Sequence, residues 1–354
     1  MSGNTEYVLI LKELRESMSA LVEGFYDAKK EREKEKLKID ISQPFSILNF
    51  PSQGLYYPDK KKSVLIKYLT AVEEHVLTDS FLVESGRGIE LVLDNLIMDD
   101  LDVRELLTGD FQALLIFLRS TAYGDNVEIA PTCPHCNKEA ENGFKLSELE
   151  FKEQKTLPNK NGKYCIEIEE INLTFILSPM TFEKELEKSK SDDEDDYFTF
   201  KDSDGTVKIK KEKTLSLAYN IESINGNSNK DLIKKVVRKI SKKHIDLLLE
   251  FIKENESGIQ DYIELNCPYC GEDFRQATAM GYDFISLPYE YKETVLEEIF
   301  LITYYGKGIT YQDAMQLPVF QRKWHIRRIK EELDKKSKAE KTAYNNAKGK
   351  KGKF

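Results

Sequence analysis

The chain has 354 residues, of which 40% are hydrophobic, and a formal net charge of -9. This length predicts two or three domains with substantial hydrophobic cores. The acidic balance argues against a general nucleic-acid binder, because neutralising phosphate requires a basic surface. No run approaches the roughly 20 apolar residues of a membrane span, and charged residues interrupt every early apolar run. We therefore expect a protein of the cytoplasm without a membrane partner.

Residues 1–38 carry a heptad pattern. Its apolar positions recur in alternating steps of four and three residues, at Tyr7, Leu11, Leu14, Met18, Leu21 and Phe25. Such a seam predicts a long helix that packs against another helix. The packing partner is either the helix's own domain or another subunit, and the second interpretation allows self-association through this N-terminal helix.

Residues 39–130 are predicted to begin with strands and to continue as helices. A turn rich in proline and glycine spans 50–58, and a strand with Val64 and Ile66 on one face follows it. Thr70 with Glu73 three residues later is a capping box, which predicts the start of a helix. Further elements are expected as helices over 89–97 and 110–121 and as an extended stretch over 127–130.

Residues 131–275 mix hairpins and helices. Alternating apolar residues predict one β-hairpin over 164–177, and Asp204-Gly205 predicts the turn of a second hairpin over 197–211. An acidic stretch over 189–196 is expected to be a loop. The remaining elements are predicted as helices over 215–224, 231–240 and 242–255 and a strand over 262–265.

Residues 276–334 are predicted to be helical, and the end of the chain is not. The expected helices cover 289–304, 310–315 and 319–335, the second beginning at Thr310 with Asp313 at its third position. Residues 335–354 contain eight lysines and one acid, Glu340. A segment with so few apolar residues cannot offset its ordering entropy, so we expect a disordered Lys-rich tail, with binding to an acidic partner as the alternative.

Four of the five cysteines form two Cys-x-x-Cys pairs, Cys133 with Cys136 and Cys267 with Cys270. Two such pairs predict one tetrahedral, four-thiolate zinc site, which is structural because it leaves no open coordination position. Disulfide pairing is the alternative, and a reducing cytoplasm disfavours it. Cys165 is expected to be a small buried residue. The predicted fold class is therefore α+β, a mostly helical body with short strands and hairpins and a zinc-ribbon-like site.

The sequence contains no phosphate-binding glycine loop, nucleophile elbow or metalloprotease helix, so it predicts no enzyme. Near the C-terminus Trp324 stands among basic residues, namely Arg322, Lys323, Arg327 and Arg328. A face of this composition suits single-stranded nucleic acid or a protein interface, and the net acidity favours the protein interface.

Three local patterns, in this order, resemble the baseplate protein family of T-even-type contractile-tailed bacteriophages, which includes hub components and hub assembly chaperones. The first is the turn over 50–58 with the Leu69-Thr70-Ala71-x-Glu73-Glu74 segment after it, although Phe50 replaces the leucine usual in the family. The second is Gly109-Asp110-Phe111 with Ala122-Tyr123-Gly124 before the first cysteine pair. The third is Ile224-Asn225-Gly226 before the second pair, with Leu317-Pro318 and Arg322-x-Trp324-x-Ile326 beyond it.

The resemblance implies a non-enzymatic structural or assembly component of the baseplate, in the hub region, that docks neighbouring tail proteins. It implies the host cytoplasm during assembly and the virion tail as locations. The alternative is a phage zinc-ribbon protein that binds nucleic acid or serves transcription. Acidic residues surround both cysteine pairs and argue against that alternative: Glu139, Glu141, Glu264, Glu272 and Asp273.

Overall fold

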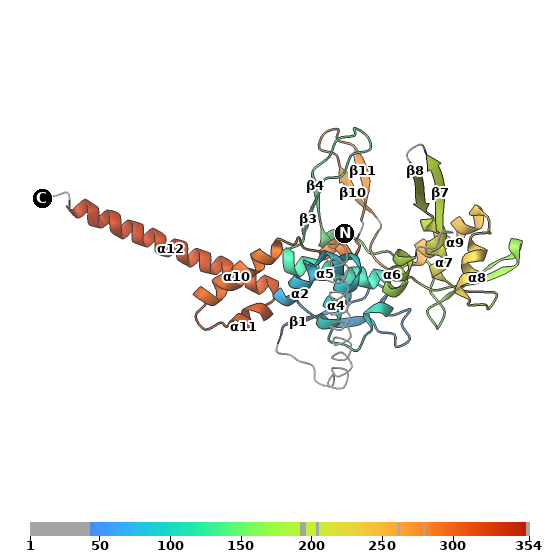
Figure 1. Cartoon of the computed structure of the whole chain (residues 1–354), viewed down its shortest axis with the longest axis horizontal. Coiled ribbons are helices and arrows are strands. Elements are labelled where there is room, and N and C mark those ends of the chain that lie inside the picture. The colour runs from blue at the N-terminus through green and yellow to red at the C-terminus, as the bar shows by residue number, and fades with distance from the viewer. Residues whose placement is uncertain (1–42, 192–195, 203–204, 261, 279, 352–354) are drawn as a thin grey trace, which may run out of the picture. The chain divides into compact units, whose positions relative to one another are not determined.

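The computed structural model describes residues 43–191, 196–202, 205–260, 262–278 and 280–351 (Figure 1). The chain divides into two units, residues 1–44 and 45–354, and the second is the one described below. The predicted heptad helix over 1–38 lies outside the described residues.

A small hairpin and four helices form the first part of the second unit. These elements are β1 (Phe45–Asn49), β2 (Ser63–Lys67), α2 (Ala71–Leu77), α3 (Ser80–Glu84), α4 (Arg87–Leu96) and α5 (Thr108–Tyr123). The capping box that begins α2 is confirmed, since Thr70 and Glu73 exchange both hydrogen bonds. Strands β1 and β2 pair antiparallel, and Val64 and Ile66 face the core as predicted.

Asp110 connects the turn after β1 to helix α5. Its carboxylate is fully buried and accepts hydrogen bonds from the Ser52 backbone N–H at 3.0 Å, the Ser52 hydroxyl at 2.6 Å and the Tyr57 hydroxyl at 2.7 Å. Burial raises the pKa of Asp110, and the three donors act against that shift. Two of the segments that carry the family resemblance are therefore in direct contact.

Gly109 allows the backbone of α5 to approach a distant loop. A Cβ atom at this position would lie 2.1 Å from the Ser257 carbonyl oxygen, which is far inside van der Waals contact. Gly258, at φ +138°, faces Gly109 from that loop. A side chain at either position would separate the two segments.

The middle of the chain forms a three-stranded antiparallel sheet with helices. The sheet order is β5-β6-β9, from Tyr164–Ile168, Leu173–Leu177 and Ile221–Ile224. The other elements are α6 (Phe182–Lys190), the hairpin β7 (Tyr197–Asp202) and β8 (Gly205–Lys210), α7 (Glu212–Asn220), α8 (Lys230–Val237) and α9 (Lys242–Asn255). Both predicted hairpins are confirmed.

Two expectations for this region were wrong. The helix expected over 215–224 ends at Asn220, because β-branched Ile221 and Ile224 find a pairing partner in β6. Cys165 is exposed instead of buried, because strand alternation turns Tyr164 inward and the next side chain outward.

Two further hairpins carry the cysteine pairs at their ends. The first consists of β3 (Asn126–Ile129) and β4 (Asn142–Lys145), and the second of β10 (Tyr262–Asn266) and β11 (Asp273–Ala277). Each hairpin pairs antiparallel. Figure 1 shows them side by side, although more than 100 residues separate them along the chain.

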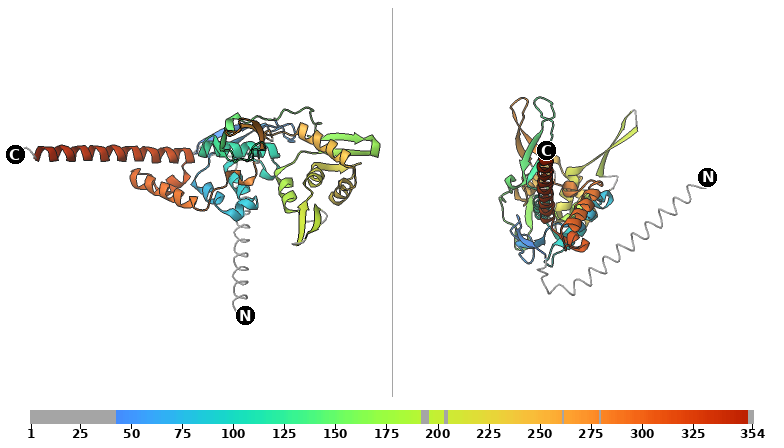
Figure 2. Two further views of the ribbon diagram at one scale, coloured as in Figure 1. Left: turned by 90° about the horizontal axis from the view of Figure 1, so that it is seen from above. Right: turned by 90° about the vertical axis from the view of Figure 1, so that its left-hand side faces the viewer.

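The C-terminal part is helical, with α10 (Tyr291–Tyr305), α11 (Tyr311–Gln316) and α12 (Val319–Lys351). The predicted helix start at Thr310 is confirmed, and Thr310 and Asp313 form a capping box. Helix α12 continues to Lys351 as one helix, whereas we expected a disordered tail over 335–354 (Figure 2). Lysine and alanine favour helix and no proline interrupts this stretch, so a helix already nucleated by its packed start can propagate. Among the described residues, none of the helices combines the length and apolarity needed to cross a bilayer.

One large hydrophobic core spans most of the second unit. The predicted ranges 39–130, 131–275 and 276–334 all contribute to it, for example through Leu114, Phe175 and Val319. A smaller core joins α10, α11 and α12 to the first residue of α2. The predicted range boundaries therefore do not separate independent cores.

Replacing Asp110 with alanine should lower the free energy of unfolding by about 3 kcal/mol, because three buried donors each lose a partner. Asp125 makes the same pair of hydrogen bonds, to the N–H and hydroxyl of Ser147, at a solvent-exposed site. Asp125→Ala is thus the matched control and should cost less than about 1 kcal/mol. Urea unfolding of both variants measures the difference in the free energy of unfolding. Equal losses in the two variants would contradict a stabilising role for the buried hydrogen bonds of Asp110.

Candidate functional site

The two Cys-x-x-Cys segments adopt the same turn. In each, the residue after the second cysteine donates its N–H to the carbonyl of the first: Asn137 to Cys133 at 2.9 Å and Gly271 to Cys267 at 2.8 Å. Asn137 and Gly271 both have positive φ, the conformation that asparagine and glycine tolerate best. Asn137 and Gly271 thus allow the tight turn that places the two thiols of each pair close together.

The four sulfur atoms of Cys133, Cys136, Cys267 and Cys270 lie within 4.8 Å of one another. The Sγ atoms of Cys133 and Cys270 are 3.8 Å apart, and those of Cys136 and Cys267 are 3.7 Å apart. Four sulfurs placed tetrahedrally at about 2.3 Å from one zinc ion are about 3.8 Å apart, whereas a disulfide requires about 2 Å. The spacing therefore fits a shared metal ion.

Because the four thiols lie close together, each one affects the pKa of its neighbours. Burial raises the pKa of Cys267, but the backbone N–H groups of Cys270 and Tyr269 and the thiols of Cys270 and Cys133 together lower it by more, to about 6. The pKa of Cys270 is raised to about 12: the Glu272 N–H lowers it, but burial and the three neighbouring thiols outweigh that effect. Four adjacent thiolates need a cation to share their charge, which is what a metal ion provides.

A small apolar cluster surrounds the cysteines. Cys133 and Cys267 are fully buried in it together with Ala140, Leu265 and Phe274. The four-cysteine site thus lies between the two hairpins and connects them, and four protein ligands complete a tetrahedral ion. This arrangement suits a metal that stabilises structure.

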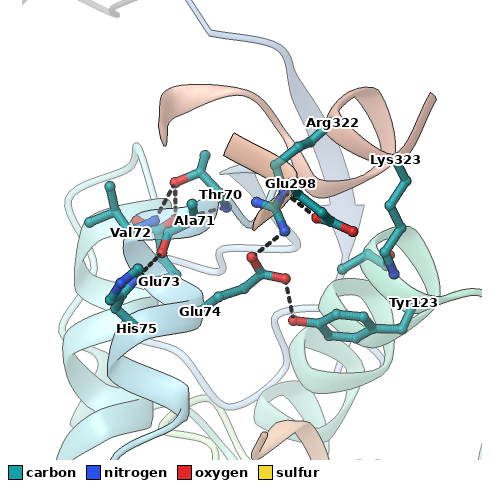
Figure 3. Close-up of polar contacts among 11 residues, drawn as sticks. Thr70, Ala71, Val72, Glu73, Glu74, His75, Tyr123, Glu298, Arg322 and Lys323 are labelled. Atoms are coloured by element: carbon teal, nitrogen blue, oxygen red, sulfur yellow. Dashed lines mark hydrogen bonds and ion pairs between the residues drawn. The ribbon is translucent and has the colours of Figure 1, made fainter. Parts of the chain in front are cut away.

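A second cluster, of buried charges, joins four helices (Figure 3). Arg322 of α12 is 0% exposed and forms ion pairs with Glu74 of α2 and, at 2.7 Å, with Glu298 of α10. The Tyr123 hydroxyl at the end of α5 donates to Glu74 at 3.1 Å. Burial and the Glu74 charge raise the pKa of Tyr123, so its hydroxyl remains a donor. A guanidinium removed from water requires such partners.

This cluster corrects the prediction for Arg322, which we expected on a basic and aromatic face. Of the predicted partner-binding residues, Trp324 and Arg327 line an open groove of about 760 Å³ between the end of α5 and the start of α12. Arg328 does not line the groove and pairs with Glu331 and Glu332 along its own helix. The residues predicted at positions 7–25 lie outside the described part of the chain.

The groove is basic and aromatic. Besides Trp324, which is 49% exposed, it is lined by Tyr123, Phe320, Lys323 and His325, and none of its lining residues is acidic. The Lys323 ammonium lies 4.7 Å from the centre of the Tyr123 ring and donates to the Ala122 carbonyl. Burial lowers the pKa of Lys323, while the nearby Glu298 and Glu74 act in the opposite direction.

The sequence pattern does not predict the roles of Glu74 and Glu298. Both are acids on the apolar side of a helix, at positions where a core residue would be expected, and this is the only signal the sequence carries. The partner Arg322 is 248 residues away from Glu74, so the pair could not be assigned from spacing.

A protein-family model described as T4 bacteriophage base plate protein matches residues 53–281, about two thirds of the chain. The chain therefore belongs to this family of phage baseplate proteins, as the motifs predicted. No curated protein and no solved structure matches it. The matched range includes Asp110, Glu74 and all four clustered cysteines, and it ends before α10.

Replacing Arg322 with methionine should lower the free energy of unfolding by roughly 3–5 kcal/mol, since two carboxylates lose their buried counter-charge. Arg328→Met removes an exposed arginine from the same helix and should cost less than ~1 kcal/mol. Denaturant unfolding compares the two. If Arg322→Met were as stable as Arg328→Met, the cluster would not connect the helices as described.

Proposed function

We propose that the chain is a non-enzymatic structural or assembly component of the hub region of the baseplate of a contractile-tailed bacteriophage. The observation that carries the proposal is the family match over residues 53–281, within which Tyr57 of the first motif and Asp110 of the second meet in a purely structural contact. The protein acts in the host cytoplasm during assembly and in the tail baseplate of the virion. Its work is to dock neighbouring tail proteins.

Zinc is the metal we assign to the four-cysteine cluster. Four thiolates in tetrahedral spacing select zinc over the hard cations calcium and magnesium, which prefer oxygen ligands. Zinc would supply a structural connection between the β3–β4 and β10–β11 hairpins. The residues that hold it are Cys133, Cys136, Cys267 and Cys270.

Docking is assigned to two surfaces. The groove with Trp324 and Arg327 offers aromatic and arginine side chains, the residue types that dominate interface energetics, and Arg328 lies beside it on the same helix. The heptad residues Tyr7, Leu11, Leu14, Met18, Leu21 and Phe25 offer a second surface for tail proteins or for self-association.

Nucleic-acid binding at the cysteine site is disfavoured by charge. Glu139, Glu141, Glu264 and Glu272 are all exposed around the two turns. The phosphates of a nucleic acid would therefore be repelled by the carboxylates around the cysteine site.

Purified protein should contain about one zinc ion per chain by mass spectrometry of metals. Cys133→Ser should lose the metal and lower the melting temperature, because zinc binding contributes to folding. Cys165→Ser changes an exposed cysteine outside the cluster and should retain one zinc. Two zinc ions per chain, or none, would contradict a shared site.

The baseplate role predicts that the chain sediments with baseplate proteins in gradients of infected-cell lysate. The double variant Trp324→Ala with Arg327→Ala should reduce this co-sedimentation at least ~10-fold, as expected for loss of interface hot spots. Leu247→Ala removes an exposed apolar side chain on α9 and should have no effect. Mass spectrometry of purified virions measures retention in the particle. A chain that sediments alone in every fraction would refute the proposal.

A further inference from the structure

Helix α12 presents aromatic and basic side chains to the groove that it forms with the end of α5, which we call the Trp324 groove. Phe320, Trp324 and Arg327 are spaced by four and three residues, so they lie on the same side of the helix. Phe320 and Trp324 are 42% and 49% exposed. Both aromatic side chains therefore leave much of their surface open to a partner, with a guanidinium beyond them.

Two arginines at the groove have no carboxylate partner. Arg327 is exposed, and within the described part of the chain it makes no ion pair. Arg119, near the end of α5, lies over the rings of Tyr123 and Phe284 at 5.8 and 5.7 Å, and among the described residues it too makes no ion pair. The Tyr123 ring also lies beside the Lys323 ammonium, as Figure 3 shows. Aromatic rings thus take the place that carboxylates usually fill around such cations.

The acids that influence the groove are already paired. Glu298 and Glu74 are the carboxylates that act on Lys323, and both form ion pairs with the buried Arg322. Two carboxylates therefore serve four cations, which leaves a surplus of two positive charges; the cations are Arg119, Arg322, Lys323 and Arg327. This surplus stands in a chain whose net charge is -9. The groove is thus complementary to an anionic group.

An acidic protein segment fits this surplus better than a nucleic acid does. A nucleic acid carries a phosphate at every nucleotide and needs a continuous track of cations. Beyond Arg327, however, helix α12 continues with the exposed acids Glu331 and Glu332. Two surplus positive charges beside two partly exposed aromatic rings match a short segment that has an apolar side chain and two or three carboxylates.

We propose that the Trp324 groove binds an acidic segment of a partner protein. An apolar side chain of this segment packs against Phe320 and Trp324, and one of its carboxylates forms a bidentate ion pair with Arg327. The inference rests on the proposed function, because it names the partner chemistry of a groove that is assigned there to docking.

Trp324 is the single tryptophan of the chain, so its fluorescence reports directly on the groove. The probe is a synthetic peptide of two leucines and four glutamates with blocked ends, which is titrated into the full chain. Binding should move the emission to shorter wavelength and saturate, because the peptide removes water from the indole. The same peptide with glutamine in place of glutamate should bind at least ~10-fold more weakly.

Two results of this titration overturn the proposal. The first is an acidic peptide that binds no better than its glutamine control, including no binding of either up to about 1 mM. The second is an oligothymidylate that saturates the signal at a lower concentration than the acidic peptide, which would make the groove a nucleic-acid site. Raised salt should weaken binding of the acidic peptide, because part of its affinity is electrostatic.

Arg327→Gln tests the ion pair and keeps the fluorescent residue. It should raise the dissociation constant of the acidic peptide at least ~10-fold. The matched control is Lys330→Gln, which removes an exposed charge of the same helix outside the groove and should change the constant less than ~2-fold. Arg327→Glu should bind a peptide with lysine in place of glutamate more tightly than the wild-type chain does. Equal effects of Arg327→Gln and Lys330→Gln overturn the assigned contact.

This inference and the baseplate role fail separately. A chain that co-sediments with baseplate proteins but does not bind the acidic peptide would overturn the acidic occupant alone. A chain that binds the peptide through Arg327 but sediments alone would refute the baseplate role and support the chemistry assigned to the groove.

Discussion

The burial of Arg322 is the constraint on which the helical part of the structure depends. A guanidinium without access to water must be neutralised by nearby acids, and Glu74 and Glu298 supply the two charges. Because these three residues belong to α12, α2 and α10, pairing them determines how the C-terminal helices attach to the first helix after β2. Tyr123 extends the same network to the end of α5. The Trp324 groove exists because α12 is held at this place beside α5.

Three other contacts act in the same way between segments that are distant in the chain. Asp110 ties α5 to the turn after β1, Gly109 lets α5 touch the loop at Ser257, and the four-cysteine site connects two hairpins. The Tyr57–Asp110 hydrogen bond, the Gly109 contact and the four cysteines lie within the range that matches the baseplate family, and Ser52 lies one residue before it. The family's motifs thus encode internal contacts. The Trp324 groove is lined partly by α12, beyond that range, and partly by the end of α5, within it.

Local patterns predicted local structure well. The capping boxes at Thr70 and Thr310 and the spacing of the cysteines depend on residues three or four apart, so their geometry follows from the sequence directly. Prediction was wrong where a distant partner decided the outcome. The strand at Ile221 exists because β6 offers an edge, and Arg322 is buried because two acids from elsewhere surround it. The tail was misjudged for a different reason: an exposed helix needs no core if its start is already fixed.

By itself, the sequence determined the α+β class, the positions of most helices and hairpins, the family, and the four cysteines as a set. Each of these is a property of short-range pattern or residue type. Only the tertiary structure decided that Arg322 lies inside and Trp324 outside, and that Asp110 meets Ser52. Those outcomes depend on which segments meet in space, because burial and charge pairing are set by neighbours that are far apart in the chain.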